Sequence, residues 1–342
     1  MKPTLVTGAS GFLGWHVARL LVARGERVRL LVRKAGPVDG LESAETVLGD
    51  LRDAASLDAA VQGCGSLFHV AADYRLWVKD PADMHRSNVL GTRHLLAAAA
   101  RAGVDRAVYT STVGCIGFVE NGLAGETSPV ALSDMTGPYK QTKFQAEAEA
   151  VAAARDLDVV IVNPTAPVGE RDWKPTPTGK TIVDFLKGKI PAFVDTGLNL
   201  VDVHDCALGH LQAREKGRRG ERYILGSENL SLQEILARLA HLTGRPAPTW
   251  RIPHWVAYTA GWFSTQAAAI TGREPDVPLD AVKMAKKKMF ATSAKAEREL
   301  GYAPAGATAA LARAVAWYQE NGYVGKSAPA LRPEAAQPGG RA

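Results

Sequence analysis

The chain has 342 residues, of which 46% are hydrophobic and 22% are charged, a balance typical of a folded globular protein and not of a disordered one. Its three cysteines are far apart and odd in number, which excludes a disulfide framework and paired zinc ligands and favours a reducing compartment. The net charge of +6 suits an anionic ligand, but no basic stripe alternates with aromatic residues, so we expect no nucleic-acid partner.

The first 165 residues alternate short apolar runs with longer helical patterns. Strands are expected at 5–6, 28–32, 67–70, 107–110 and 159–162, and helices at 15–23, 57–61, 88–102 and 139–154. Apolar strands that alternate with helices form parallel sheets joined by right-handed crossovers. The sequence therefore predicts an α/β fold in which residues 1–165 form a doubly wound parallel (Rossmann) sheet.

The pattern changes after residue 165, where proline, threonine, glycine and lysine become frequent. Later segments mix short strands with helices. We predict a smaller C-terminal α/β lobe at 166–326 that mainly binds the substrate, with the chain recrossing to the first domain around 201–226. Residues 327–342 are rich in proline, alanine and glycine and are expected to be a flexible tail.

The strongest local signal is the run Thr7-Gly8-Ala9-Ser10-Gly11-Phe12-Leu13-Gly14, which follows the first strand and opens the first helix. Glycines permit a tight turn and the close approach of a pyrophosphate, whose charge is met by the free N–H groups and positive dipole end of the helix. In this setting the run predicts a dinucleotide site, not a plain turn. The predicted cofactor contacts here are Gly8, Ser10, Gly11, Phe12, Leu13 and Gly14.

The second strand ends in Arg33-Lys34, without the acidic residue that usually binds the ribose hydroxyls of NAD. Arg33 lies 19 residues beyond Gly14, close to the offset of about 20 at which the ribose is recognised. An arginine there accommodates the 2′-phosphate, so NADP is the predicted cofactor. NAD stays possible if Arg33 is only an exposed strand end.

Tyr139 and Lys143 stand four residues apart on a predicted helix and so share one face. An ammonium beside a phenol favours its ionised form and makes it a usable acid or base. Ser111 and Thr112 follow the strand at 107–110, at the strand end where ligands bind parallel sheets. The alternatives are a surface pair and an ordinary Ser/Thr turn.

These motifs, in this order, resemble the short-chain dehydrogenase/reductase superfamily in its extended branch, the NAD-dependent epimerase/dehydratase family, over about residues 3–325. Further matching pieces are 49–53, 68–72, 88–92, 163–164 and 203–205. The resemblance implies that Asp50 and Leu51 contact the adenine, that Ala71, Ala72 and Pro164 line the cofactor, and that Tyr139 and Lys143 also contact it. It favours Thr112 over Ser111 as the catalytic hydroxyl. We expect a cytoplasmic homodimer.

Longer strings at 69–77, 162–169, 174–179 and 194–200 resemble hopanoid-associated sugar epimerases, relatives of the dihydroflavonol 4-reductase group. That resemblance implies a place in hopanoid side-chain metabolism but does not fix the reaction. Thr112 is followed by Val113-Gly114 and not by the Asp-Glu pair of the sugar-nucleotide dehydratases, which sets dehydration aside. We expect a sugar epimerase-like enzyme; the alternatives are an NADPH-dependent ketone reductase and a non-catalytic NADP-binding regulatory protein.

Polar residues after the strand at 67–70 are the candidate substrate contacts. They are Asp73, Tyr74 and Arg75, to which Thr165 is added; the alternative is a polar loop around Trp77. Arg171, Lys174 and Lys180 would hold a phosphate or carboxylate, or form a solvated basic surface. His69 and His204 lack ligand partners at metal spacing, so we assign no metal.

The stretch 255–263 is the most aromatic of the chain, and Val256, Ala260, Phe263, Ala267 and Ile270 recur at helical spacing. One alternative is a helix buried against the core of the second lobe. The other is an exposed helix that covers the substrate or lies on the inner membrane surface, where tryptophan and tyrosine rings are favoured.

Overall fold

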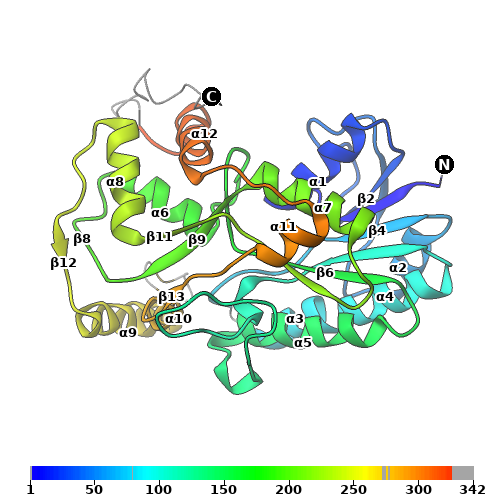
Figure 1. Cartoon of the computed structure of the whole chain (residues 1–342), viewed down its shortest axis with the longest axis horizontal. Helices are drawn as coiled ribbons and strands as arrows, with labels where there is room; N and C mark the ends of the chain where they lie inside the picture. Colours follow the sequence, from blue (N-terminus) through cyan, green and yellow to red (C-terminus); the bar gives the residue numbers. More distant parts are fainter. Residues whose placement is uncertain (1, 79, 272–274, 276–277, 326–342) are drawn as a thin grey trace.

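The computed structural model of the chain describes residues 2–78, 80–271, 275 and 278–325. The predicted tail at 327–342 lies outside these residues. Figure 1 shows two parts side by side, a large sheet flanked by helices that carries the N-terminus and a lobe of short strands and helices.

A seven-stranded parallel sheet forms the centre of the first part. In spatial order its strands are β3 (Glu45–Leu48), β2 (Val28–Val32), β1 (Thr4–Thr7), β4 (Ser66–His69), β5 (Arg106–Thr110), β6 (Val159–Pro164) and β10 (Arg222–Leu225). The chain order reverses between β1 and β4, the switch point at which a doubly wound sheet opens a crevice for a ligand. The predicted Rossmann fold is confirmed.

Helices cover both faces of this sheet (Figure 1), which explains why its central strands are apolar along their whole length. On one face α1 (Phe12–Ala23) packs with α7 (Val203–Lys216), where Leu21 and Leu211 are fully buried. The other face carries α2 (Ala54–Val61), α4 (Gly91–Arg101) and α5 (Gly137–Ala153). Because α7 and β10 belong to these layers, the chain returns to the sheet at 203–225.

Shorter elements connect the crossovers. They are α3 (Pro81–His85), a π-helix at Arg86–Leu90, and 3₁₀ turns at Val113–Cys115 and Leu132–Asp134.

The second part is built on a small sheet in which β9 (Gly197–Asp202) pairs with β7 (Ala166–Val168), β11 (Glu228–Ser231) and β13 (Lys288–Met289). A two-stranded ladder joins β8 (Ala192–Phe193) to β12 (Trp250–Arg251). Three helices enclose the core of the lobe: α6 (Pro177–Leu186), α8 (Leu232–Thr243) and α12 (Ala307–Glu320). Outside this core lie α9 (His254–Thr271), α10 (Leu279–Met284) and α11 (Ala294–Leu300).

The apolar stripe predicted at 256–270 lies on α9, but most of it faces solvent. Phe263 is 67% exposed and Ile270 is 87% exposed. Of the two alternatives, burial of this stripe against the core is excluded, because α9 packs mainly on α10, at one end of the lobe. No helix within the described residues is both long and apolar enough to cross a bilayer.

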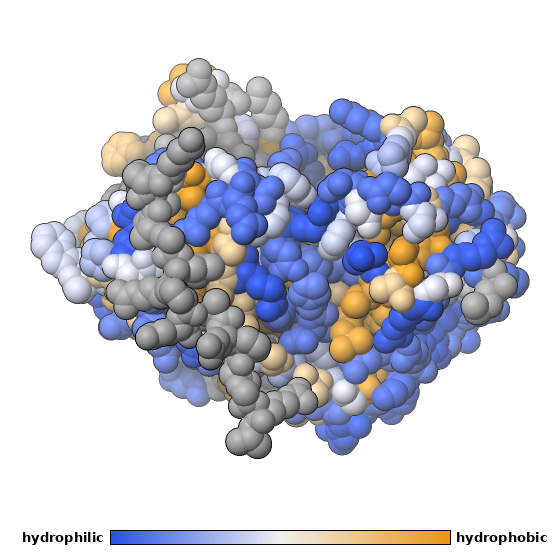
Figure 2. Space-filling view, turned by 90° about the horizontal axis from the view of Figure 1, so that it is seen from above, coloured by the Kyte–Doolittle hydropathy of each residue, from blue (hydrophilic) through white to orange (hydrophobic). Residues whose placement is uncertain are grey.

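The face on the α12 side of the molecule is mostly hydrophilic (Figure 2). Hydrophobic side chains gather there in a few places, of which the broadest lies over the part that carries the seven-stranded sheet. The helix α9 lies toward the opposite side of the lobe from α12 (Figure 1).

Candidate functional site

The glycine run forms a backbone cradle between β1, β4 and α1. Gly8 has φ +78°, and a Cβ there would come within 2.8 Å of the Ala71 nitrogen. A Cβ at Gly14 would come within 2.2 Å of the Gly8 oxygen, so the helix starts directly on the turn. The Thr7 hydroxyl accepts hydrogen bonds from the backbone N–H groups of Val70 and Ala71, both at 3.1 Å. This fixes the end of β4 beside the cradle.

The N-terminus of α1 fits an anionic group. Its N-cap is Gly11, in extended conformation, and no side chain caps the first turn. Ser10 is exposed beside it, and Phe12 and Leu13 are half-buried. Free N–H groups at a helix N-terminus, with only glycine backbone in front of them, are the arrangement that binds a pyrophosphate. The residues present therefore fit the predicted dinucleotide.

The basic residue predicted at the ribose lies at the carboxyl end of β2. Arg33 directly follows β2 and is exposed. Asp50 lies nearby but pairs with Arg52 at 2.7 Å, and the Arg52 guanidinium holds the pKa of that carboxyl down to about 2, with a smaller contribution from Arg33. Leu51 packs against Gly91, where a Cβ would come within 2.8 Å of the leucine Cβ.

The predicted catalytic residues converge at the ends of β5 and α5. Tyr139 is half-buried in the first turn of α5, and its phenol lies close enough to the Thr112 side chain for that hydroxyl to act on its pKa. Ser111 is buried beside the thiol of Cys115. Thr112, rather than Ser111, is therefore the hydroxyl that meets Tyr139.

Lys143 lies one helical turn after Tyr139, but its ammonium binds other groups than the Tyr139 phenol. Its ammonium donates to the Thr110 carbonyl at 2.7 Å and to the Tyr109 hydroxyl at 3.0 Å. Burial lowers the pKa of Lys143 to about 8. Burial also raises the pKa of the Tyr139 phenol, so the sequence-based expectation of a lowered phenol pKa is not met in this structure.

A buried polar network holds Thr112 in place. The Asn163 side-chain amide donates to the Thr112 carbonyl at 3.1 Å and to the Glu147 carboxylate at 2.7 Å. Arg222 of β10 completes it with an ion pair to Glu147 at 3.2 Å. The sequence analysis named Asn163 only as part of a matching dipeptide. The role of Glu147 was missed, although an acid on the buried face of a helix is itself a signal of a polar partner.

The candidate substrate loop is clamped by Asn88, whose role the sequence reasoning missed. The Asn88 amide oxygen accepts from the Asp73 N–H at 2.8 Å, while its nitrogen donates to the Asp73 carbonyl at 2.9 Å and to the Thr142 hydroxyl at 3.2 Å. Asn88 lies on the π-helix, a feature often found at functional sites. The loop is thereby tied to α5 close to Tyr139.

Some of the predicted substrate contacts form ion pairs or hydrogen bonds within the protein. Asp73 pairs with Arg75, and the Tyr74 hydroxyl donates to the Lys174 carbonyl of the lobe at 3.1 Å. Thr165 is half-buried, and its N–H donates to the Leu225 carbonyl at 3.1 Å. Ala72 is half-buried at the end of β4.

Two of the three basic residues that follow β7 already have acidic partners. Arg171 pairs with Asp39 at 2.7 Å and lies over the Trp15 ring at 4.0 Å, and Lys180 pairs with Asp184 at 2.6 Å. Lys174 is exposed and close enough to lower the pKa of Asp73. It is therefore the member of this trio best placed to meet an anionic group of a substrate.

The two histidines considered as metal ligands have other partners. His69 is fully enclosed between the hydroxyls of Thr7 at 2.9 Å and Thr92 at 3.0 Å. His204 lies with His16 and Glu170, and their ligand atoms are within 4.8 Å of one another, a grouping that sequence spacing did not show. Arg313 donates to the same Glu170 carboxylate at 3.2 Å. Because that guanidinium supplies the positive charge, we assign no metal there.

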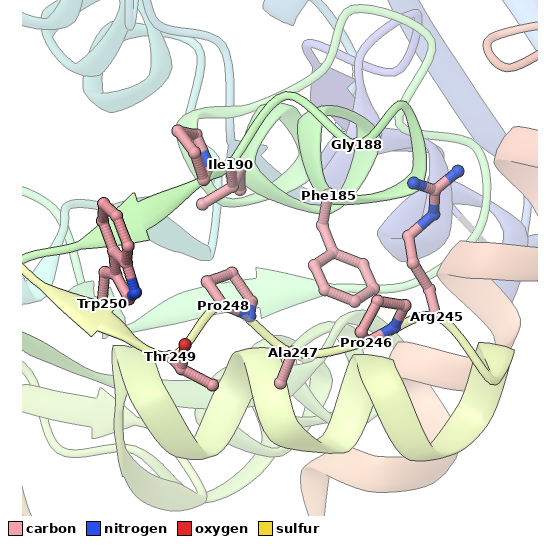
Figure 3. A pocket seen from close by; sticks show the side chains of 10 residues that line it. Phe185, Gly188, Ile190, Arg245, Pro246, Ala247, Pro248, Thr249 and Trp250 are labelled. Atoms are coloured by element: carbon pink, nitrogen blue, oxygen red, sulfur yellow. The ribbon is translucent and has the colours of Figure 1, made fainter.

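A cavity of about 450 Å³ lies in the lobe between the end of α6 and the segment 245–250 (Figure 3). Arg245 and Trp250 stand at its two ends, and Phe185 points toward the proline-rich segment between them. It contains none of the residues described above, so it is separate from the site around Tyr139.

The comparisons with known proteins agree with this geometry. The model of the NAD dependent epimerase/dehydratase family matches residues 4–226. A protein of Synechocystis sp. whose name describes it as dihydroflavonol 4-reductase-like is 48% identical over 93% of this chain and 95% of its own length. Sterol demethylase protein B of Methylococcus capsulatus is 37% identical over 94% of this chain and 99% of its own. The crystal structure of gox2253 is 44% identical, with a TM-score of 0.84 over 95% of this chain and all of the other.

The glycine cradle on a Rossmann sheet, the paired Thr112 and Tyr139, and these matches lead to one conclusion. The chain belongs to the NAD dependent epimerase/dehydratase family, and it is an NAD(P)-dependent enzyme of the oxidoreductase type.

Proposed function

We propose that the protein is an NADPH-dependent reductase that converts a ketone on a large apolar substrate into a secondary alcohol. The observation that carries the proposal is the Tyr139 phenol, which lies close to the Thr112 side chain and whose pKa is raised by burial, so that it is protonated near neutral pH. A protonated phenol at the substrate oxygen is suited to donate a proton.

In this proposal each residue has one task. The Thr112 hydroxyl holds the substrate carbonyl oxygen, and Tyr139 gives that oxygen its proton. When bound, the cofactor supplies the hydride that adds to the carbonyl carbon, so that ketone, hydride and proton together give the alcohol. Lys143 would leave the Thr110 carbonyl to hold the nicotinamide ribose. The other predicted cofactor contacts, Gly8 to Gly14, Asp50, Leu51, Ala71, Ala72 and Pro164, line the path between adenine and nicotinamide.

The names of the relatives support an apolar ketone as the substrate. One is described as a dihydroflavonol 4-reductase and the other as a sterol demethylase protein, and both names imply a ring-bearing, sparingly polar molecule. Hopanoid side-chain metabolism stays our proposal for the pathway. We also retain the proposals of a cofactor domain at 1–165, a substrate lobe at 166–326, a homodimer and a cytoplasmic location.

The epimerase-like reaction is the second candidate, because the family includes epimerases by name. The two reactions treat the cofactor differently: an epimerase regenerates it in each cycle, whereas a reductase must exchange it. We expect protein purified without added cofactor to carry little nicotinamide and to bind NADPH reversibly. Tightly retained, stoichiometric oxidised cofactor, released only on denaturation, would favour the epimerase instead.

The choice of NADPH is tested at Arg33. Arg33→Asp should weaken NADPH binding by at least about tenfold and NADH binding far less, since only NADPH carries the 2′-phosphate. Fluorescence titration of both cofactors measures the two changes, with Arg155→Asp as a control for the altered charge. An equal loss for both cofactors at Arg33 would show that the arginine does not select between them.

A further inference from the structure

The helix α9 presents large apolar side chains to solvent. Trp255 is 70% exposed, Trp262 44%, Phe263 67% and Ile270 87%. Trp262 and Phe263 contact each other edge to face, with ring centroids 5.0 Å apart. We call these four residues, together with the partly exposed Tyr258, the α9 face. An exposed apolar face on one helix marks an interaction site more often than a random surface does.

Lysines stand beside the α9 face. The Lys286 ammonium lies 5.6 Å from the centre of the Tyr258 ring, and the Lys287 ammonium lies 5.0 Å from the centre of the Phe118 ring. Lys288 continues the run but pairs with Asp195 at 3.1 Å. Cations at the edge of an aromatic, amphipathic face complement an anionic partner whose interior is apolar.

The α9 face is continuous with the end of the molecule that carries the catalytic residues. The partner helix α10 adjoins the start of α5, since a Cβ at Gly137 would come within 2.3 Å of the Asp280 carboxylate. Lys287 is close enough to Lys140, the residue after Tyr139, to lower its pKa, after the larger effect of burial.

The loop between Thr112 and Tyr139 extends this apolar surface. Its side chains Phe118, Leu123 and Leu132 are 42%, 52% and 42% exposed. The loop is joined to the segment after β13 by a bridge between Ala124 and Ala291. The loop that connects the two catalytic residues therefore exposes apolar side chains. Lys287 contacts the same loop, at Phe118.

We propose that the α9 face docks on the surface of an anionic lipid bilayer, with Lys286 and Lys287 at the headgroups and the aromatic rings at the boundary with the acyl chains. A lipid-borne ketone then enters the Tyr139 site from the bilayer without crossing water. The docking rests on the α9 face alone, whereas the entry of substrate rests on the proposed function. The association that we propose is peripheral, and no helix among the described residues is long and apolar enough to span a bilayer.

Flotation of the full chain on vesicles tests the docking without any measurement of activity. We expect the wild type to float with vesicles of phosphatidylcholine and phosphatidylglycerol, and less with phosphatidylcholine alone. Trp262→Ser/Phe263→Ser should reduce flotation at least about tenfold on both, since the apolar contact is lost. Lys286→Gln/Lys287→Gln should reduce it about tenfold on the anionic vesicles and little on the neutral ones.

Matched controls separate this surface from general effects. Leu48→Ser/Leu208→Ser removes two exposed apolar side chains from β3 and α7, and Arg19→Gln/Arg155→Gln removes two charges from α1 and the end of α5. Both controls, and Tyr139→Phe, should float like the wild type. Circular dichroism confirms that each variant is folded.

Three outcomes would overturn the proposal. The first is folded wild type that floats with neither vesicle. The second is an equal loss in the α9 variant and its control. The third is a lipid-free wild type whose sedimenting mass falls when Trp262 and Phe263 are replaced, which would make the α9 face a contact between two copies of the chain. If the protein floats with vesicles but proves to be an epimerase, the proposed docking still stands, and only the proposed reductase function is contradicted.

Discussion

Burial, more than the neighbouring charge, sets the acid–base character of Tyr139. The i, i+4 spacing places Lys143 on the correct face, but the ammonium satisfies its own burial by binding the Thr110 carbonyl and the Tyr109 hydroxyl. Burial raises the pKa of the Tyr139 phenol, which lies close to the Thr112 side chain. Of the two roles that the sequence spacing leaves open for Tyr139, acid or base, the raised pKa favours the proton donor.

Replacement of Tyr139 by phenylalanine tests that role. Tyr139→Phe keeps the ring and its packing but removes the proton, so kcat should fall by about 100- to 10,000-fold. Cofactor affinity and the thermal midpoint should stay close to those of the wild type. Steady-state kinetics and cofactor titration provide the readouts, and Tyr323→Phe, far along the chain, serves as the control. Retention of most activity would remove Tyr139 from the mechanism.

At the scale of elements, the π-helix at Arg86–Leu90 carries Asn88 to the loop that follows β4. Asn88 is only 2% exposed, and its side-chain hydrogen bonds go to the Asp73 backbone and to Thr142 on α5. One side chain thereby connects the loop, the π-helix and the helix that bears Tyr139. The geometry of the candidate substrate loop depends on this connection.

Asn88→Ala should therefore change substrate binding more than the chemical step. The variant leaves the Asp73 N–H without its partner, and such a loss costs about 1–3 kcal/mol. We expect a lower free energy of unfolding by roughly that amount and a raised KM with a smaller change in kcat. Urea unfolding and kinetics measure both, against Asn321→Ala, which loses a half-buried bond at the end of α12. A normal KM would show that the loop does not need the clamp.

At the scale of the whole molecule, three buried histidines couple stability to pH. Burial lowers the pKa of His16 to about 4, of His69 to about 3 and of His210 to about 4. In the unfolded chain the same groups take up a proton near pH 6.5. Acid therefore favours the unfolded chain, whereas His204, whose pKa is raised by Glu170, acts in the opposite direction and stabilises the fold below its unfolded pKa.

The lowered pKa values of the three histidines predict that the free energy of unfolding decreases as the pH falls from about 6.5 toward 4. Each buried histidine contributes at most about 1.4 kcal/mol per pH unit to this decrease. Urea unfolding at a series of pH values measures this slope. His210→Gln should make the slope shallower by about one proton, since it removes one of the three groups. A free energy of unfolding that stays flat over this range, with an unchanged dependence on urea, would contradict the three lowered pKa values.

The sequence predicts an element correctly where the local residue pattern is sufficient to specify its backbone geometry. The glycine run, the apolar strands and the helical spacing around Tyr139 are local features, and each forces one backbone geometry whatever the rest of the chain does. β3 escaped prediction because Glu45–Leu48 is an edge strand with mixed exposure and no apolar run. The assigned roles of the site residues stay predictions until the variants above are measured.

The sequence by itself determined the Rossmann sheet, the cofactor cradle and the residues that gather at its strand ends, because these follow from local spacing. Tertiary structure alone decided that Lys143 turns to Tyr109, that Asn163 and Glu147 hold Thr112, and that the α9 stripe faces outward. Each depends on segments far apart in the chain, and a periodic apolar stripe looks the same whether a core or solvent lies against it. Only the packed molecule shows which side is covered.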